Sequence, residues 1–445
     1  MTEIGVKTIT VMGLGYVGLP TAALLARAGY QVRGVDVSDR VVDALSSGDC
    51  PLGEPEVAEI VKQALASGNL TASKAPMPAD AFIICVPTPV RVDKTADLTM
   101  VRAAISAAAP AVNKGSLIIL ESTSPIGTTR DVIGAELGRN GLDPEQDVDV
   151  CYCPERVFPG ETVREILRND RVVGGLTKTA AERAKALYES FCEGTAVTTT
   201  AEAAEYSKLM ENSFRDVNIA LANIFARIAE DLSVDVQEVI TLANRHPRVN
   251  VHKPGPGVGG HCIPVDPWFL IEGAPSASEL LRISRSINEG QAERLLDRAE
   301  EAGLPPKSRV AVLGAAYRGD LDDARESPTE DLLNVLQERG YEWSVHDPFV
   351  RYMKTHNGVP SNLTDDLDAA LEGVAAAIVM TDHSAYRAVS SETFERMAGR
   401  LIVDGRRMIH EQSLINAGFT VVPVGAPTAV PPATATMPPK SADAP

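Results

Sequence analysis

One segment of the chain has the composition that a reactive cysteine needs around it. Residues 254–267 read PGPGVGGHCIPVDP, and the first seven of them include four glycines and two prolines. Such a segment forms neither a helix nor a regular strand, and it lets the backbone approach a ligand closely while one side chain is held in place. A buried structural cysteine needs no such surroundings, so we expect the thiol of Cys262 to be reactive. The neighbouring His261 could serve as a base or could simply pack within the loop.

Further polar groups could act beside this thiol. Residues 201–231 contain no glycine or proline and predict one helix, about 45 Å long and able to bridge two domains. On it Lys208, Asn212 and Arg215 share a face, because their spacing is i, i+4 and i+7. Taken alone, such charged residues usually face solvent. Lys208 could stabilise an oxyanion or transfer protons, and Asp266 could position a water or pair with this lysine.

The N-terminal segment has the pattern of a dinucleotide-binding unit. A β-rich run at 7–12 enters the glycine turn 13–18, GLGYVG, and a helical pattern follows that ends at Gly29. A second strand, 30–36, ends at Asp36, which lies 18 residues after the last glycine of the turn. This strand, turn, helix, strand and acid predict dinucleotide binding, although three glycines could also serve only a tight turn.

Three more apolar runs, 81–87, 116–123 and 148–154, predict buried parallel strands that alternate with helices. Each ends in polar or proline residues. Because ligands of such sheets lie beyond the carboxyl ends of the strands, we expect Thr88, Thr123 and Glu155 to converge beside the nicotinamide. The alternative is that these residues only cap the helices that follow.

A cysteine nucleophile in a nicotinamide-dependent protein implies a particular chemistry. A thiolate adds to an aldehyde to give a thiohemiacetal, which loses hydride to give a thioester that water cleaves. Cys262 therefore predicts oxidation past the aldehyde to the acid.

A second α/β unit begins near residue 308. Strands are expected in 308–319, 341–348, 374–383 and 399–407, with a helix at 327–340. The spacing of Gly314 and Gly319 is not that of a dinucleotide turn, so a nucleotide sugar or another phosphate ligand is expected there. Beyond about 425 the chain is rich in Pro, Ala and Thr without periodicity and is expected to be disordered.

Composition limits the remaining possibilities. The 445 residues carry 42 basic and 60 acidic side chains, a net charge of −18, which argues against nucleic-acid binding. No apolar run is long enough to span a bilayer and no signal segment precedes the first strand, so no membrane partner and a cytoplasmic location are expected. Six cysteines are too few for a secreted disulfide framework. Without a CxxC pair or a histidine cluster, no metal site is expected.

Seven motifs stand in order between about residues 7 and 425: GLGYVGLP, VPTP, STSPIGTT, CPER, KLMEN, GGHCIPVD and DARESP. In these the chain resembles the UDP-glucose/GDP-mannose 6-dehydrogenases, four-electron NAD-dependent enzymes that convert a nucleotide sugar to its uronate. The resemblance implies an α/β fold with two Rossmann-like doubly wound domains joined by a central long helix and helical domain. The implied parts are an NAD-binding domain (1–200), a central domain with the cysteine loop (201–304), a UDP-sugar domain (305–425) and a disordered tail (426–445).

The resemblance also implies roles for particular residues. Cys262 would be the nucleophile, Lys208 and Asn212 would hold the substrate oxygen and oxyanion, Asp266 would assist through water, and Glu155 with Thr123 would serve proton transfer. NAD would be held by Gly13, Gly15, Tyr16, Val17, Gly18, Asp36, Arg40, Thr88, Thr123 and Arg325. An acid at position 36 favours NAD over NADP, because it accepts the ribose hydroxyl and repels a 2′-phosphate.

Two local details resemble one branch of the family. The cysteine loop GGHCIPVDPWFL is similar to that of enzymes acting on UDP-N-acetylhexosamines, and residues 243–250, ANRHPRVN, are similar to those acting on UDP-N-acetyl-D-mannosamine. The expected reaction is oxidation of the C6 hydroxyl of UDP-N-acetyl-D-mannosamine to the uronate. The substrate contacts implied in addition to Lys208 and Asn212 are Arg156, Val157, Arg215, His246, Arg248, Gly259, Tyr317, Arg318 and Arg407.

Alternatives remain open at this stage. The substrate could be UDP-N-acetylglucosamine or UDP-glucose, and the protein could bind a nucleotide sugar without turning it over. A two-electron hydroxyacid or 6-phosphogluconate-type dehydrogenase would share the dinucleotide unit and long helix but would not need the cysteine loop. The resemblance further implies a homodimer built on the long helix, whose apolar positions could instead be covered by its own chain.

Overall fold

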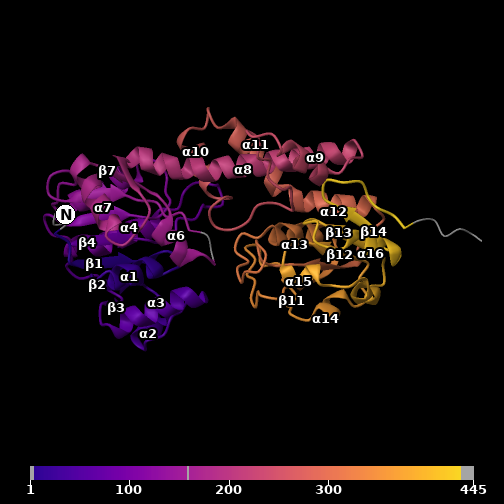
Figure 1. Cartoon of the computed structure of the whole chain (residues 1–445), viewed down its shortest axis with the longest axis horizontal. Helices are drawn as coiled ribbons and strands as arrows, with labels where there is room; N and C mark the ends of the chain where they lie inside the picture. The colour runs from indigo at the N-terminus through magenta and orange to yellow at the C-terminus, as the bar shows by residue number, and fades with distance from the viewer. Residues whose placement is uncertain (1–4, 158–159, 432–445) are drawn as a thin grey trace, which may run out of the picture. The chain divides into compact units, whose positions relative to one another are not determined.

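The computed structural model describes residues 5–157 and 160–431. Contacts divide the chain into two compact units. The first comprises the chain up to Ser213 together with Val265–Glu279, and the second comprises Phe214–Pro264 together with the chain from Leu280 onward. The predicted long helix is present as α8 (Ala201–Asp231), the long magenta helix of Figure 1. Residues of the expected central domain, 201–304, thus contribute to both units, and the domain bounds stay a prediction.

The first unit contains one eight-stranded sheet. Its strands are β1 (Thr8–Met12), β2 (Gln31–Val35), β3 (Leu70–Ser73), β4 (Ala81–Ile84), β5 (Leu117–Leu120), β6 (Asp149–Tyr152), β7 (Arg171–Gly175) and β8 (Ala196–Thr200). Their order is β3-β2-β1-β4-β5-β6-β7-β8, and every neighbouring pair is parallel except β6 with β7. The first six strands have the doubly wound order, with its switch point between β1 and β4.

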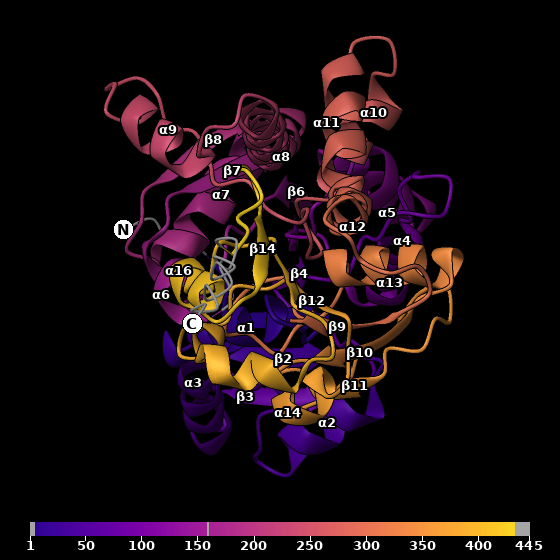
Figure 2. The same cartoon turned by 90° about the vertical axis from the view of Figure 1, so that its right-hand side faces the viewer.

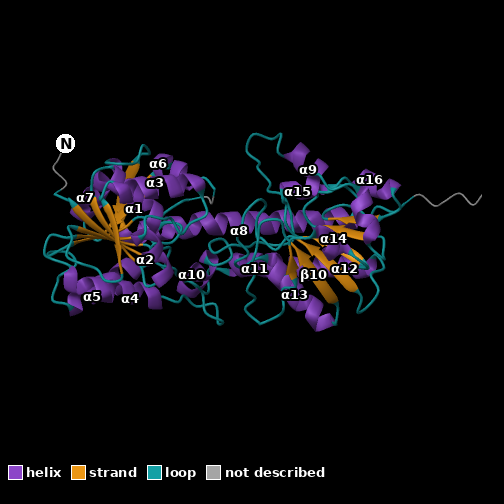
Figure 3. Cartoon of the chain, turned by 90° about the horizontal axis from the view of Figure 1, so that it is seen from below, coloured by secondary structure: helices purple, strands orange, loops and turns teal. Residues whose placement is uncertain are grey.

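Helices cover both faces of this sheet. They are α1 (Gly18–Arg27), α2 (Asp39–Ser46), α3 (Pro55–Ala66), α4 (Thr99–Ala108), the 3₁₀-helix η1 (Ala109–Ala111), the π-helix η2 (Thr129–Gly134), α5 (Ala135–Arg139), α6 (Thr162–Arg168) and α7 (Lys178–Glu189). The same unit contains α10 (Asp266–Gly273), which packs with Leu209 of α8. Successive strand residues point to opposite faces: Ile83 belongs to the core cluster with residues of α1, α3 and α7, and Phe82 and Ile84 to the cluster with residues of α4 and α5. Figure 3 shows these two groups of helices on opposite sides of the sheet. Burial on both faces explains why these strands are continuously apolar in the sequence.

The second unit repeats the doubly wound arrangement. Its strands are β9 (Arg309–Leu313), β10 (Glu342–His346), β11 (Leu363–Thr364), β12 (Ala376–Val379), β13 (Leu401–Asp404) and β14 (Thr420–Pro423), all parallel in the order β11-β10-β9-β12-β13-β14. Its further helices are α9 (Val236–Ala243), α11 (Glu279–Glu289), α12 (Gln291–Glu301), α13 (Pro328–Arg339), α14 (Leu367–Leu371), α15 (Ser384–Arg387), η3 (Ser391–Arg396) and α16 (Glu411–Asn416). Helices α12 and α13 cover one face and α14 and α16 the other (Figure 2).

Local sequence explains how individual elements begin and end. Helix α13 starts where the Ser327 side chain accepts a hydrogen bond from the amide of Thr329, with Pro328 in the first turn. It ends at Gly340, whose φ of +77° is left-handed and therefore suits glycine.

The predicted α/β fold, with two Rossmann-like sheets and a central helical region, is confirmed.

The C-terminal segment is described only in part. Of the expected disordered tail, residues 426–431 are described, and Ala429 exchanges two backbone hydrogen bonds of 2.8 Å with Val421. Residues 432–445 lie outside the described residues. Within the described ranges, no helix combines the length and apolar character that crossing a membrane requires.

Candidate functional site

The turn between β1 and α1 fits a dinucleotide. A Cβ atom at Gly13, where φ is +92°, would lie 2.6 Å from the carbonyl oxygen of Cys85, and one at Gly18 would lie 1.9 Å from the carbonyl oxygen of Gly13. At Gly15, by contrast, a Cβ would meet no heavy atom within 4 Å. Two glycines therefore close the turn tightly, and the third leaves its backbone open to a pyrophosphate at the N-terminus of α1.

The acid that follows β2 is fixed beside this turn. The half-buried carboxylate of Asp36 accepts hydrogen bonds from the amides of Leu14 (2.8 Å) and Ser38 (2.9 Å). The side chain of Tyr16 is 36% exposed on the same turn. These residues fit the adenosine half of NAD. When NAD is bound, its nicotinamide half supplies the hydride acceptor for an oxidation. Arg40, also predicted to contact the cofactor, is exposed on α2.

Thr88, Thr123 and Glu155, which follow β4, β5 and β6, do not all share the same partners. The hydroxyl of Thr88 donates a hydrogen bond to the carbonyl oxygen of Thr123, so these two residues lie together. Glu155 is buried, and its carboxylate accepts hydrogen bonds from the guanidinium of Arg171 (2.7 Å) and the amide of Arg156 (2.7 Å). Both carboxylate oxygens of Glu155 are therefore already bound by protein groups.

Three predicted catalytic side chains meet inside the first unit. Lys208, Asn212 and Asp266 are 7%, 7% and 2% exposed. The Asn212 amide donates a hydrogen bond of 2.5 Å to Asp266, and the Lys208 ammonium donates one of 2.8 Å to the carbonyl oxygen of Glu155. Burial raises the pKa of Asp266 to about 6, while the charge of Lys208 and the Asn212 hydrogen bond oppose the shift. A carboxylate with that pKa can exchange protons near neutral pH.

The cysteine loop up to Pro264 lies in the second unit, and its glycines are required by close packing. A Cβ atom at Gly259 would lie 2.6 Å from the carbonyl oxygen of Glu326 and 2.6 Å from Cβ of Tyr317. Gly260, with φ +85°, donates its amide to the carbonyl of Arg325 (3.3 Å). No helix or strand occurs between α9 and α10, as predicted.

Cys262 itself is half-buried in this loop. Its sulfur lies 3.1 Å from Nδ1 of the exposed His261. Tyr317 packs against the same loop, because a Cβ at Gly260 would lie 3.0 Å from its ring. Burial raises the pKa of Tyr317 to about 12, and the charges of Asp323 and Cys262 contribute in the same direction. The thiol is thus held beside an imidazole.

The remaining predicted contacts fall into two groups. Some are engaged within the protein: Arg156 binds Glu211 (2.6 Å), Val157 packs partly against the core of the first unit, Arg325 binds Asp323 (2.6 Å) and Arg407 binds Asp235 (2.7 Å). Others are accessible on the second unit, with Arg215, His246 and Arg248 exposed and Arg318 half-buried. The roles of all these residues stay predictions.

The structure adds a residue that the sequence analysis passed over. Arg406 follows β13, donates Nε to the carbonyl of Met380 (2.9 Å), and places Nη1 3.1 Å from where a Cβ of Gly255 would lie. Burial lowers the pKa of Arg406, and the charge of Asp382 opposes this. A partly desolvated cation at the carboxyl edge of the second sheet suits a diphosphate. Arg406 and Arg407 are adjacent in the sequence, and nothing there indicates which one faces the cysteine loop.

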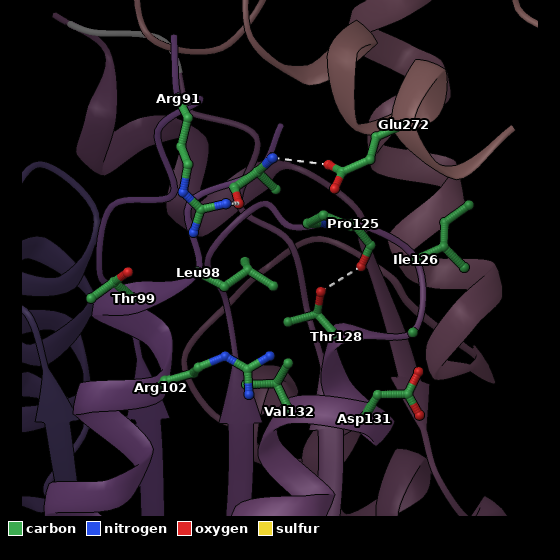
Figure 4. A pocket seen from close by; sticks show the side chains of 12 residues that line it. Arg91, Leu98, Thr99, Arg102, Pro125, Ile126, Thr128, Asp131, Val132 and Glu272 are labelled. Atoms are coloured by element: carbon green, nitrogen blue, oxygen red, sulfur yellow. Dashed lines mark hydrogen bonds between the residues drawn. The ribbon is translucent and has the colours of Figure 1, made fainter. Parts of the chain in front are cut away.

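A separate cavity of about 350 Å³ lies in the first unit (Figure 4). Its lining includes Arg102 and Glu272, which accepts the amide of Ala96 (2.9 Å), and Thr128, which donates to the carbonyl of Pro125 (2.7 Å). None of its lining residues belongs to the predicted site. Among the described residues, no group of three or more His, Cys, Asp or Glu side chains could hold a metal ion.

Models of one protein family match three parts of the chain. The UDP-glucose/GDP-mannose dehydrogenase family's NAD binding domain matches residues 7–192, its central domain 202–290 and its UDP binding domain 311–411. These matches cover most of the chain and include most strands of both sheets.

Individual relatives agree with the family models. The chain is 40% identical to a UDP-N-acetyl-D-mannosamine dehydrogenase of Methanocaldococcus jannaschii, over 94% of this chain and 96% of the relative. It is also 40% identical to an NDP-N-acetyl-D-galactosaminuronic acid dehydrogenase of Ralstonia solanacearum, over 91% and 97%. A solved UDP-D-ManNAc dehydrogenase of Pyrococcus horikoshii superimposes with a TM-score of 0.87 at 40% identity, over 94% of this chain and 99% of that one. The chain therefore belongs to the UDP-glucose/GDP-mannose dehydrogenase family and is an NAD-dependent UDP-sugar dehydrogenase.

Proposed function

We propose that the protein oxidises the C6 hydroxyl of UDP-N-acetyl-D-mannosamine to a carboxylate and reduces two NAD for each sugar. The observation that carries the proposal is the buried set of Lys208, Asn212 and Asp266, with a carboxylate whose pKa is about 6. The reactive thiol is close along the chain. Cys262 precedes Asp266 by four residues, and four residues span at most about 14 Å even when extended.

Each of these groups has a distinct task in the proposed reaction. The thiolate of Cys262 forms a C–S bond with the aldehyde carbon, and oxidation of that adduct leaves a thioester. Lys208 and Asn212 hold the substrate oxygen and the oxyanion with positive charge and an N–H donor. Asp266 takes a proton from the water that breaks the C–S bond, which releases the acid and restores the thiol. The proton-transfer roles expected for Glu155 and Thr123 stay predictions.

The choice of sugar rests on similarity. The relative from M. jannaschii and the structure from P. horikoshii are both named for N-acetylmannosamine. Residues 243–250 resemble enzymes acting on that sugar, and the cysteine loop resembles enzymes acting on UDP-N-acetylhexosamines. The R. solanacearum relative, named for another N-acetylated sugar, favours a second candidate substrate of the galacto configuration.

The expected homodimer is supported by a stripe of exposed apolar residues along α8 and at Leu232, which directly follows it. They follow one another at intervals of four, four, seven, four, three and four residues, all of which keep them on one face of a helix. They are Tyr206 (45% exposed), Met210 (51%), Phe214 (65%), Leu221 (44%), Phe225 (39%), Ile228 (47%) and Leu232 (68%). We propose that a second copy of the chain covers this stripe.

The test of the function is a side-by-side assay of purified protein with NAD. UDP-N-acetyl-D-mannosamine, UDP-N-acetylgalactosamine, UDP-N-acetylglucosamine and UDP-glucose would each be supplied, and the products identified by mass spectrometry. The proposal expects uronate from the first sugar at the highest kcat/KM. Calorimetric binding of UDP-sugars without turnover of any would favour a non-catalytic binding protein instead.

A further inference from the structure

Four buried polar side chains connect α8 with α11 inside the second unit. Asp216 and Asn223 lie seven residues apart on one face of α8, and Arg285 and Asn288 lie on α11. None of the four is more than 2% exposed. A buried ionic and polar network contributes little net stability compared with apolar residues of similar volume, but when its hydrogen bonds are made it fixes the orientation of its members.

This network has a direction that begins at the carboxylate. Oδ1 of Asp216 accepts Nη1 of Arg285 at 2.7 Å and Nδ2 of Asn288 at 2.9 Å. The carbonyl oxygen of Asp216 also accepts Nδ2 of Asn288, at 3.0 Å. With its NH₂ group committed in this way, Asn288 presents its amide oxygen to Asn223, whose Nδ2 donates to it at 3.0 Å. The amide oxygen of Asn223 is therefore left as the acceptor at the far end of the relay.

That far end is the base of the cysteine loop. Oδ1 of Asn223 accepts the buried backbone amide of Gly255 at 2.9 Å. The residues on both sides of Gly255 are prolines, which have no N–H, so this amide is the one backbone donor of that tripeptide. Two residues further on, a Cβ atom at Gly257, where φ is +130°, would lie 3.0 Å from the carbonyl oxygen of Asn288. Both asparagines therefore contact the loop where it enters the site.

The rest of the loop depends on this base. No helix or strand occurs between α9 and α10, so the loop lacks the backbone ladder that fixes a regular element. Closer to Cys262, Gly259 and Gly260 pack against Tyr317, and the Gly260 amide makes a longer bond of 3.3 Å to the carbonyl of Arg325. The position of the thiol is thus set by that packing and by the anchor at Gly255.

We propose that Asn223 and Asn288 are positioning residues for the oxidation, which relay the fixed orientation of Asp216 to Gly255 and so hold the cysteine loop where the thiol of Cys262 meets the aldehyde carbon. This inference rests on the proposed function, because it assigns the support of the nucleophile in that same reaction.

The first readout is the mobility of the loop, measured by hydrogen exchange and mass spectrometry on the full-length protein. Asn223→Ala removes the acceptor of the Gly255 amide. We expect the peptide that covers residues 254–264 to exchange at least about tenfold faster than in wild type, while peptides from the strands of the same unit exchange as before. This measurement needs no substrate.

The second readout is the number of NADH formed per UDP-N-acetyl-D-mannosamine consumed. A displaced thiol slows the second oxidation more than the first, because only the second passes through the thiol adduct. For Asn223→Ala we expect kcat for uronate to fall by about 10- to 100-fold. We expect the NADH per sugar to fall from two toward one, with the aldehyde found by mass spectrometry. The KM for NAD should stay within about threefold, because the dinucleotide turn belongs to the first unit.

Ser344→Ala is the matched control. It removes another buried hydrogen bond of the second unit, from the Ser344 hydroxyl to the carbonyl of Ala370 (2.7 Å), which involves no residue of the loop. The control should keep two NADH per sugar and the exchange rate of the loop, because lost stability alone reduces the amount of active enzyme without dividing the two oxidations.

Two results would overturn the inference. One is a folded Asn223→Ala enzyme in which the loop exchange and the NADH per sugar are both unchanged. The other is a Ser344→Ala enzyme that shifts both readouts as far as Asn223→Ala does. If Asn223→Ala fails to fold, Asn288→Ala is judged by the same two readouts, because it removes the amide oxygen that orients Asn223. Failure of the proposed function would look different: wild type would form no uronate, and the exchange comparison would still decide whether Asn223 holds the loop.

Discussion

The side-chain amide of Asn212 donates a hydrogen bond to the carboxylate of Asp266 across 2.5 Å, although the two residues are 54 positions apart. The carboxylate is 2% exposed and has a pKa of about 6, raised by burial. The environment thus prepares Asp266 to take a proton from water at neutral pH, while Asn212 fixes the direction in which the carboxylate points.

Replacing Asp266 by asparagine should stop the reaction after the oxidations. Without a base the thioester on Cys262 forms but hydrolyses slowly, so kcat for uronate should fall by about 10²- to 10⁴-fold. Intact-protein mass spectrometry of the quenched reaction should find the sugar adduct on the enzyme. Glu272→Gln, on the same helix, is the control, because Glu272 binds the amide of Ala96. Full uronate production by Asp266→Asn would remove Asp266 from the mechanism.

The same carboxylate predicts two effects of pH. Uronate formation should fall as pH drops through about 6, because the protonated Asp266 cannot act as a base.

The free energy of unfolding should change in the opposite sense. The folded-state pKa lies above the unfolded value, so the contribution of Asp266 to stability is present below pH 4 and is lost as pH rises through 6. Between pH 5 and 8, the free energy of unfolding of wild type relative to Asp266→Asn should fall by about 1 kcal/mol, measurable by urea denaturation.

Local patterns in the sequence predicted the main elements of both sheets. Runs such as 81–87 and 116–123 could be predicted as strands because both faces of a parallel sheet are buried. The turn at Gly13 and Gly18 could be predicted because close packing there excludes a Cβ atom. Strand β7 escaped prediction, since it has five residues, begins with a charged Arg171 and runs antiparallel to β6.

Side-chain pairings could not be predicted from the sequence. Glu155 follows a strand just as Thr123 does, so the pattern gave both the same role. Only the folded structure places Arg171 against the Glu155 carboxylate and the Lys208 ammonium against its carbonyl. The partner that decides what a polar residue does comes from another part of the chain, and periodicity carries no information about it.

Adjacent arginines after β13 should differ in their effect on nucleotide binding. Arg406 lies beside Gly255 of the cysteine loop, whereas Arg407 is paired with Asp235 at 2.7 Å. Arg406→Gln should weaken UDP binding by about 10- to 100-fold in isothermal titration calorimetry, as expected for loss of charge-assisted hydrogen bonds. Arg407→Gln should weaken it less. The reverse ranking would assign the diphosphate contact to Arg407.

A charge in the exposed stripe of α8 should separate the proposed dimer. Leu221 and Phe225 are 44% and 39% exposed and one helical turn apart. Leu221→Glu should convert the dimer to monomer in sedimentation experiments, because burying a carboxylate in an apolar interface is unfavourable. Gln63→Glu, on the exposed side of α3, adds the same charge elsewhere and should leave the association unchanged. A wild-type protein that sediments as a monomer would contradict the proposal.

The most direct test of the account is the number of NADH formed per UDP-N-acetyl-D-mannosamine consumed. Wild type should give two, with the uronate as product. Cys262→Ser should lose that ratio and make little uronate, because it lacks the thiolate that carries the second oxidation. One NADH per sugar in wild type, or undiminished uronate from Cys262→Ser, would contradict the assignment of Cys262 as the nucleophile.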